Sequence, residues 1–457
     1  MSRAAPLRAL LLLALPMVLA RATQSVMTFA DALLVKHLGT DAIAASATGG
    51  FNVYLFTMLP VGTVFIVQSF VAQLVGRGDA DDAPRFAWYG LGIAAVSAVA
   101  AFAMIPGIRP VLELTHYSPG VREQMAEYMT LRMYGVFAII AVEVLGNWYG
   151  GLGNTWMSLV ASLVSMAVDL FLNWVLIFGH LGAPEMGVNG AALSSAIGSW
   201  VGFLFLAVAF YRRWGGAPRG RAALGRARGL SLHELGRVVR FGLPNGINWF
   251  LEFAAFQLVF VNFVFSGLGD ELVAALNVVI AINSLSFMPA FGLASAGAIL
   301  AGQAIGGGDR DAVWPQVRVT LLCTMTWMCA IGAVYLVIPA QLMELFDEGG
   351  RSVALVTTGA TMLVISAAWQ LFDAIGMTLS ETLRAAGDTA WTAGARFVLA
   401  WAIFVPAGFY VVRELDGGAL GAMVCIVGYL ALLAVAFAYR FRSGAWRKIE
   451  LIEPKLV

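Results

Sequence analysis

Five carboxylate side chains lie within long apolar stretches of this sequence, where an ionised group has no water to solvate it. The five are Asp31, Glu143, Asp169, Glu252 and Asp373. A carboxylate at the centre of a bilayer costs roughly 2.5–3.5 kcal/mol on insertion scales, so we expect most of these acids to serve a function. An ion pair with Arg21 or Arg132, which lie in the same stretches, is the structural alternative. Glu143, near the end of its stretch, is equally well explained as a solvated residue.

Two of the acids have polar or aromatic neighbours at helical spacing. Asp169 and Asn173 are four residues apart, so they share one face of a helix and can present two oxygen ligands to one small cation. Trp369 precedes Asp373 by one helical turn, an arrangement suited to an organic cation that binds against an aromatic ring. A tryptophan that only packs in the core or at the membrane interface is the alternative.

The first apolar stretch carries three residues that could link ion binding to a change of shape. Gln24 and Asp31 are two turns apart on one face, separated by about 10.5 Å along the axis. Pro16, about four turns from Asp31, leaves one backbone carbonyl without its helical partner. A kink at Pro16 would let ion capture bend this helix.

The composition requires these residues to be positioned by membrane helices. Of 457 residues, 60% are apolar and only 12% are charged, against roughly 25% charged in soluble domains. The composition argues against nucleic-acid binding and against a soluble active site, and three cysteines inside apolar runs form neither a disulfide framework nor a metal site. Runs of about 20 apolar residues predict an all-α integral membrane protein with twelve spans. They lie near 9–35, 45–72, 86–108, 124–147, 156–179, 188–211, 242–266, 272–302, 315–338, 353–380, 390–412 and 417–439.

The charged residues predict the orientation and the division of the chain. An even number of spans places both termini on the same side of the membrane. Most of the 28 lysines and arginines lie on that side, which predicts that both termini are cytoplasmic. The segment 212–240 holds eight arginines and one acid, Glu234. A capping pattern at Ser231 predicts a short amphipathic helix on the inner leaflet, and a solvated basic linker is the equal alternative. The predicted parts are an N-terminal six-helix lobe (1–211), the linker (212–240), a C-terminal six-helix lobe (241–440) and a cytoplasmic tail (441–457).

The two predicted lobes are internal repeats. Residues 73–79 recur at 303–309, and residues 151–155 recur at 385–389, at nearly constant offsets. Six spans per repeat is an even number, so both copies enter the membrane in the same direction, as in secondary transporters with a substrate path between two bundles. A phosphate loop follows a β-strand, and no strand is predicted before the repeated glycines. The glycines therefore predict helix ends at the cytoplasmic face.

In this order, the motifs resemble the multidrug and toxic compound extrusion (MATE) family, on its bacterial side and with NorM-type features, from about residue 10 to 440. The resemblance rests on the Pro-Gln-Phe-Ala-Asp pattern that ends at Asp31, residues 71–78 and their repeat at 302–303, and residues 151–155, 172–173, 250–253, 370–373 and 383–389. It implies a V-shaped pair of six-helix lobes that exports cationic, amphipathic compounds in exchange for H⁺ or Na⁺, without a cofactor.

Carried over position by position, the resemblance implies two sites. The coupling-ion site of the N-terminal lobe comprises Asp31, Asp169, Asn173 and Ser195, with Na⁺ at the first three as one possibility, and Pro16 and Gln24 support it. The substrate or cation site of the C-terminal lobe comprises Glu252, Asp373 and Trp369. Asp169 stands where the family more often has Asn, and Trp369 replaces the usual tyrosine, which leaves the coupling ion and the second site's geometry open.

Two other functions compete with export of organic cations. A flippase of a lipid-linked saccharide precursor needs inward-facing arginines or lysines for a pyrophosphate, whereas we assign five acids but only Arg21 and Arg132 to the interior of the spans. A membrane-embedded enzyme needs catalytic side chains, yet none of the four histidines lies deep in a span. We therefore expect a monomeric transporter of the bacterial inner membrane, not an enzyme. Its partners are small organic cations, the coupling ion and the lipid bilayer.

Overall fold

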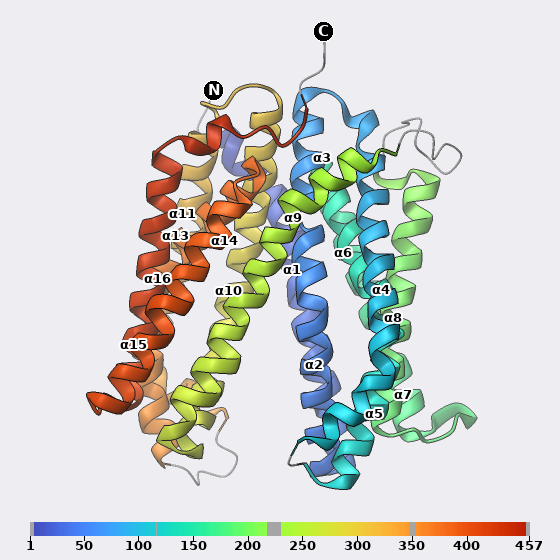
Figure 1. The fold of residues 1–457 in the computed structure, drawn as a ribbon, viewed down its shortest axis with the longest axis vertical. Helices are drawn as coiled ribbons and strands as arrows, with labels where there is room; N and C mark the ends of the chain where they lie inside the picture. The colour runs from blue at the N-terminus through green and yellow to red at the C-terminus, as the bar shows by residue number, and fades with distance from the viewer. Residues whose placement is uncertain (1–3, 116, 217–229, 347–352, 454–457) are drawn as a thin grey trace. The chain divides into compact units, whose positions relative to one another are not determined.

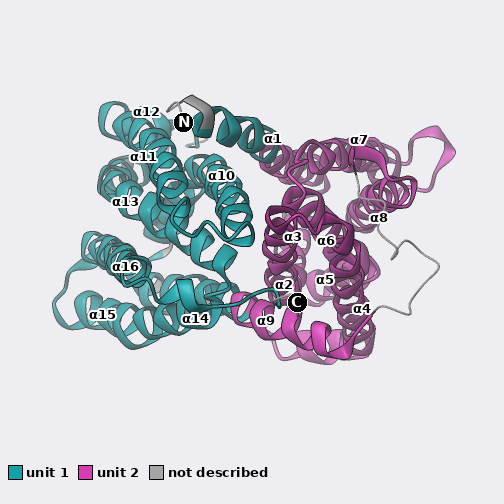
Figure 2. Ribbon diagram, turned by 90° about the horizontal axis from the view of Figure 1, so that it is seen from above, with its two compact units in different colours: residues 1–18, 247–457 teal, residues 19–246 magenta. Residues whose placement is uncertain are grey.

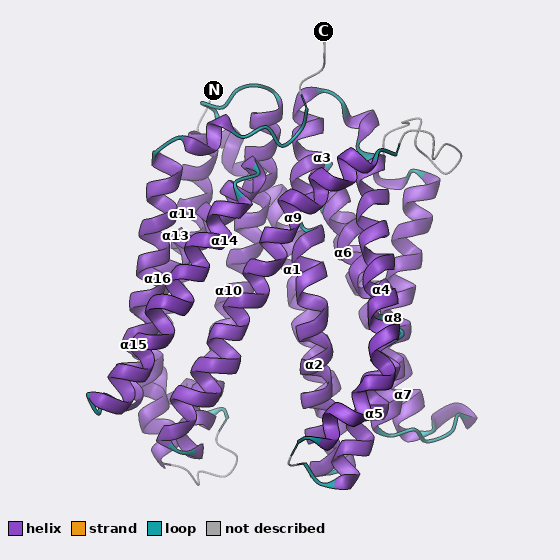
Figure 3. Ribbon diagram, viewed as in Figure 1, coloured by secondary structure: helices purple, strands orange, loops and turns teal. Residues whose placement is uncertain are grey.

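The described part of the chain is helical. The computed structural model describes residues 4–115, 117–216, 230–346 and 353–453, and these ranges contain no β-strand (Figure 3). Within these ranges, eleven helices are long and apolar enough to cross a membrane. A twelfth span is formed by α5 (Pro119–Met133) and α6 (Val136–Gly151), which meet at 44°. The predicted all-α membrane fold with twelve spans is therefore confirmed.

The helices follow the predicted spans closely and are labelled in Figure 1. The first half of the chain contains α1 (Ala4–Val35), α2 (Thr40–Val64), α3 (Ile66–Arg77), α4 (Pro84–Glu113), α5, α6, α7 (Trp156–Phe178) and α8 (Val188–Arg212). The second half contains α9 (Leu232–Phe253), the π-helical η6 (Ala254–Phe265), α10 (Asp270–Gly306), α11 (Val313–Val337), α12 (Pro339–Glu344), α13 (Val353–Ala386), α14 (Thr389–Phe397), the π-helical η8 (Val398–Phe404), α15 (Val405–Phe409), the π-helical η9 (Tyr410–Glu414) and α16 (Gly418–Arg442).

The helices pack into two compact units (Figure 2). Unit 2 comprises residues 19–246, and unit 1 comprises residues 1–18 together with 247–457. The sequence placed the division in the segment 212–240, but the chain passes between the units within α1 and within α9. Each unit thus contains part of a helix that begins or ends in the other.

The start of α1 belongs to unit 1 because its apolar surface completes that unit's core. Leu10 and Ala14 are 1% and 2% exposed and pack with Ala296 of α10. Further along, a Cβ on Gly292 of α10 would lie 2.8 Å from Val18, so the two helices approach closely. The close approach of these backbones holds the start of α1 in unit 1.

The start of α9 is held by unit 2. Arg85 Nη1 of α4 donates to Glu234 Oε1 (3.0 Å), and the Tyr89 hydroxyl donates to Glu234 Oε2 (2.8 Å). The helix begins at Leu232 and runs without interruption to Phe253, so the helix predicted after Ser231 is continuous with the span. Residues 217–229 of the predicted linker lie outside the described residues.

A glycine sets the close approach of α9 to α2. A Cβ on Gly246 would lie 2.2 Å from the Leu59 carbonyl oxygen and 2.4 Å from Thr63 Oγ1. Beside it, Asn245 Nδ2 donates to the Gly62 carbonyl (2.7 Å). The methyl group of an alanine at position 246 has no room unless α9 and α2 move apart.

Gly246→Ala is therefore expected to lower the free energy of unfolding by about 1–3 kcal/mol, the usual cost of overpacking. Gly236, on the exposed face of the same helix, has nothing within 4 Å of an added Cβ and is the matched control. There, alanine improves helix propensity by about 1 kcal/mol. Thermal unfolding in detergent micelles would compare the two variants, and equal stability would contradict the packing argument.

The repeated glycines end helices, as predicted. They adopt the left-handed conformation at matched places in the repeats. The glycines are Gly78 and Gly308 (φ 84° and 81°), and Gly153 and Gly387 (φ 83° and 86°). The amide of the following residue closes the turn in each case: Asp79 donates to the Leu74 carbonyl (2.8 Å) and Asp309 to the Ala304 carbonyl (3.1 Å). This closure is the usual chemistry of a helix C-terminus.

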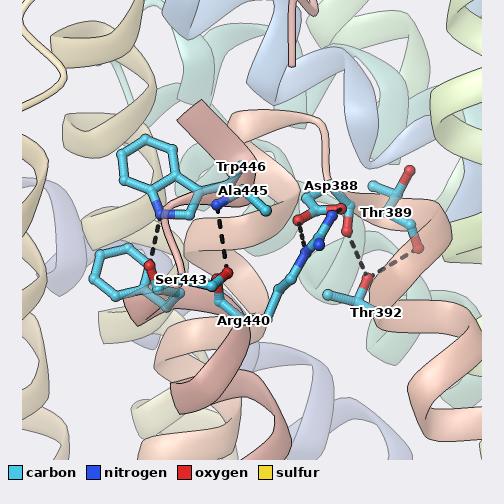
Figure 4. A network of polar contacts seen from close by, with 8 residues as sticks. Asp388, Thr389, Thr392, Arg440, Ser443, Ala445 and Trp446 are labelled. Carbon is cyan, nitrogen blue, oxygen red and sulfur yellow. Dashed lines mark hydrogen bonds and ion pairs between the residues drawn. The ribbon is translucent and has the colours of Figure 1, made fainter. Parts of the chain in front are cut away.

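The predicted tail 441–457 folds back onto unit 1 over the part that is described. Arg440 donates through Nε and Nη2 to the two carboxylate oxygens of Asp388, at 2.6 and 3.1 Å (Figure 4). Trp446 is 3% exposed and donates from Nε1 to the Phe441 carbonyl (2.9 Å). The end of α16 is thereby tied to the helix-ending turn before α14.

Candidate ion and cation sites

Unit 2 brings four of the predicted site residues together. Asn173 Nδ2 on α7 donates to Asp31 Oδ1 on α1 (2.6 Å) and to Asp169 Oδ2 (3.1 Å). The two carboxyl groups lie within hydrogen-bonding reach of each other, and the Ser195 hydroxyl of α8 lies beside Asp169. These four residues, from three helices, are called the acid cluster below.

Three residues of the acid cluster are buried where α7 packs against α8, whereas Asp31 is half-buried. Asp169 and Asn173 are fully buried, and Ser195 is 6% exposed. A Cβ on Gly198 of α8 would lie 3.1 Å from the Asp169 Cβ, so the glycine eases the close approach of α8 to α7. Because charges interact more strongly in such an enclosed place than in water, a single proton or cation strongly changes the electrostatics.

Arg132 of α5 supplies a third charge, whose role the sequence left open. Its guanidinium attracts the carboxylates of both Asp31 and Asp169. Tyr128, one turn earlier, is 9% exposed and feels the same three charges. Two carboxylates and one guanidinium sum to −1, so one proton or one monovalent cation neutralises the group.

Two oxygens of the acid cluster are left without hydrogen-bond partners. Asp169 Oδ1 and Asn173 Oδ1 are both buried and accept no hydrogen bond in the described structure. Leaving such an atom unsatisfied costs about 1–3 kcal/mol, so a further partner is expected here. Carboxylate and amide oxygens are ligands for hard cations, and the same carboxylates can take up a proton. The residues therefore fit either a proton or a small hard cation.

Gln24 does not reach the acid cluster, although it lies on the same helix as Asp31. Arg21 Nη1 donates to Gln24 Oε1 (3.0 Å), and both Nη atoms of Arg21 donate to the Glu143 carboxylate (3.3 and 3.4 Å). The Arg21 guanidinium also lies 5.6 Å from the centre of the Phe65 ring. Glu143 is thus half of an ion pair that links α1 to α6, which is the structural alternative given above.

Unit 1 contains a second group of charges, around Glu252 at the end of α9. Arg396 of α14 forms an ion pair with Glu252 through Nη1 and Oε2, and the Tyr429 hydroxyl donates to Glu252 Oε1 (3.5 Å). Asp373 of α13 lies close enough to feel the charges of both partners. The Arg396 side chain is 14% exposed and is paired inside the unit.

Trp369 lies in the core of unit 1 and not on an open wall. It is 7% exposed, and its Nε1 donates to Asn283 Oδ1 (3.1 Å). Gln370 Nε2 donates to the same oxygen (2.6 Å), so the indole is fixed within a buried polar network. This position favours the packing interpretation of Trp369 over a role in contacting a cation.

Comparison with known proteins decides the family. The MatE family model matches residues 16–175 and 250–409, which together make up more than half of the chain. The chain belongs to the MatE family. Each half of this MatE protein carries one match, which confirms the internal duplication that the helix-ending glycines predicted.

Relatives of this MatE protein extend over nearly its whole length. A probable multidrug resistance protein NorM of Pseudomonas putida is 28% identical, covering 98% of this chain and 96% of its own. The multidrug resistance protein NorM of Burkholderia vietnamiensis is 26% identical, at 94% and 92% coverage. The multidrug resistance protein PmpM of Pseudomonas aeruginosa is 27% identical, at 89% and 84% coverage.

Solved structures share the MatE fold. A multidrug resistance MATE family transporter in an outward-facing conformation matches with a TM-score of 0.88 at 21% identity, over 98% of both chains. The eukaryotic MATE transporter AtDTX14 matches with a TM-score of 0.87 at 16% identity, over 98% of this chain and 97% of its own. The family and its named relatives are transporters rather than enzymes.

Sequence reasoning missed the residues that balance the acids in this MatE protein. Arg396 pairs with Glu252, and Tyr429 donates to it from a different helix. A signal for Arg396 was present, because it lies inside the predicted span 390–412, where an arginine needs a partner. No comparable signal identified Tyr429, since a tyrosine is common in apolar helices.

Proposed function

We propose that this protein is a secondary active antiporter that exports cationic or amphipathic organic compounds in exchange for H⁺ or Na⁺. The observation that carries the proposal is the acid cluster, in which Asp169 and Asn173 keep two buried oxygens without partners. The full-length relatives named as multidrug resistance proteins support the cargo class. The protein needs no cofactor beyond the coupling ion.

The ion and the cargo use different units. The acid cluster in unit 2, with Arg132, carries a charge of −1 when both carboxylates are ionised, and uptake of one H⁺ or Na⁺ neutralises it. Coupling requires that this uptake bias one conformation over another. Helix α1 is suited to transmit the bias, because it carries Asp31 in unit 2 while its first four turns pack in unit 1.

Dye efflux from everted membrane vesicles tests the proposal. Vesicles that contain the protein should accumulate a cationic dye when a Na⁺ or proton gradient is imposed, and vesicles without the protein should not. Running the Na⁺ and proton gradients separately identifies the coupling ion. Dye movement that is independent of both gradients would refute antiport.

Pro16→Ala is expected to slow turnover more than it weakens ion binding. Pro16 is buried, lies two residues before α1 passes from unit 1 to unit 2, and deprives the Leu12 carbonyl of its helical donor. Alanine restores that hydrogen bond and stiffens the helix. Efflux rates and the ion concentration for half-maximal efflux would be measured together. Pro106→Ala, an exposed helical proline of α4 within unit 2, is the control.

The alternative cargo, a lipid-linked saccharide precursor, is less well supported by the charges. Among the described residues of the spans, Arg21, Arg384 and Arg396 each pair with an acid, and Arg132 faces two. A pyrophosphate group needs arginines that are available to bind it. Transport of such a lipid in reconstituted vesicles, without dye efflux, would favour this alternative.

We further propose a monomer in the bacterial cytoplasmic membrane with both termini in the cytoplasm. The start of α1 packs against the end of α10 and the start of α11. Arg447, after α16, pairs with Asp311 between the same two helices (2.7 Å). Both ends of the described chain are therefore on one side of unit 1. Cysteine labelling of each terminus in intact cells and everted vesicles tests the orientation.

A further inference from the structure

The Glu252 carboxylate in unit 1 is already occupied by groups of the protein itself. Arg396 donates to one of its oxygens and Tyr429 to the other. The Arg396 guanidinium also lies against an aromatic ring, with its centre 5.4 Å from the centre of the Phe437 ring. A cation that used Glu252 would first have to displace this guanidinium.

Asp373, unlike Glu252, lacks such a partner. It forms no hydrogen bond or ion pair with another residue in the described ranges. Glu252 and Arg396 both act on its carboxyl group through their charges, one repelling and one attracting negative charge. When all three groups are ionised, their formal charges sum to −1. Because Glu252 and Arg396 are paired with each other, this charge falls on Asp373.

We infer that Arg396 is a tethered internal cation that sets the charge selectivity of unit 1. It neutralises Glu252 and leaves Asp373 as the single anionic group for cargo. Unit 1 is therefore matched to compounds with one positive charge, and a second positive charge on the cargo meets repulsion from Arg396. This inference rests on the proposed export of organic cations and assigns the specificity of that function to a residue pair.

The test compares binding of ethidium, a monocation, and propidium, its dicationic analogue with the same ring system, to the purified protein by fluorescence titration. Glu252→Gln leaves Arg396 unpaired beside Asp373 and should weaken ethidium binding about tenfold or more. Glu252→Gln combined with Arg396→Gln removes both charges and should restore ethidium binding to near the wild-type affinity. Asp373→Asn should weaken binding of ethidium about tenfold or more in the wild-type background.

Arg396→Gln alone supplies the selectivity measurement. It exposes a second negative charge, so the ratio of propidium to ethidium affinity should rise about tenfold relative to wild type. Removing one partner of a buried pair destabilises proteins much more than removing both, so the double variant remains informative when a single variant fails to fold. The control is Asp311→Asn with Arg447→Gln, which removes an exposed ion pair of the same unit.

Three results would overturn the inference. If the double variant binds ethidium no better than Glu252→Gln, then Glu252 itself holds the cation. If Asp373→Asn binds ethidium with wild-type affinity, the cargo charge lies elsewhere. In both cases the proposed function is still supported, provided that the wild-type protein binds ethidium and drives dye efflux. If the wild-type protein binds neither dye and moves no organic cation, the proposed function and the inference fail together.

Discussion

Asp31→Asn is expected to reduce ion-driven efflux to the level of vesicles without the protein. The Asp31 carboxyl contacts both Asn173 and Asp169, and it is the only charged group that α1 contributes to the acid cluster. An asparagine can neither take up a proton nor offer a carboxylate to Na⁺. With Asp31 neutral, Asp169 and Arg132 already balance each other, and ion uptake has no electrostatic driving force.

The experiment needs to separate loss of transport from loss of protein. Removing a charge from a membrane helix lowers the cost of insertion, so the variant should be present in the membrane at normal levels. Asp41→Asn, at an exposed position in the first turn of α2, is the matched control and should transport normally. If Asp31→Asn supports efflux at the wild-type rate, the assignment of Asp31 to the coupling site is wrong.

Asp169→Asn is expected to uncouple the transporter from its ion gradient. The substitution leaves Asp31 and Arg132 with a combined charge of zero before any ion binds, whereas the wild-type group has −1. It also replaces Asp169 Oδ1, one of the two buried oxygens without a partner. Residual dye movement should therefore no longer respond to pH or Na⁺.

Proteoliposomes with imposed Na⁺ and proton gradients would measure this response. A second measurement, thermal unfolding with and without Na⁺, reports ion binding independently of transport: if Na⁺ couples, it should raise the melting temperature of the wild type but not of Asp169→Asn. Ser195→Ala is the control, because it removes a neutral oxygen and should only raise the ion concentration needed. If Asp169→Asn retains full ion-driven efflux with unchanged ion dependence, Asp169 does not carry the coupling charge, which would then have to lie in unit 1.

The membrane fold could be predicted from the sequence because the bilayer imposes the same requirement on each span. A helix must present about 20 mostly apolar residues to cross, so spans such as 156–179 and 188–211 match α7 and α8 closely. The duplication was visible for a related reason. Glycines such as Gly78 and Gly308 end helices with φ near 80°, a conformation that few other residues adopt readily.

The acid cluster was also partly predictable. A carboxylate within an apolar span is costly, which singled out Asp31 and Asp169, and the four-residue spacing placed Asn173 beside Asp169. The contact between α1 and α7 joins residues 142 positions apart, and its hydrogen bond depends on how the helices pack. The resemblance to known transporters, rather than spacing, brought Ser195 into this group.

By itself the sequence determined the class of protein, its spans, its repeat and which buried acids require an explanation, because each follows from the cost of placing a residue in lipid. Only the tertiary structure decided which partner each acid has. Arg21 balances Glu143 and Arg396 balances Glu252, while Asp373 is left with the net charge of the group that it forms with Glu252 and Arg396. These pairings join positions more than 120 residues apart. They depend on the close approach of whole helices, which small residues such as Gly198 and Gly246 permit and which no local pattern encodes.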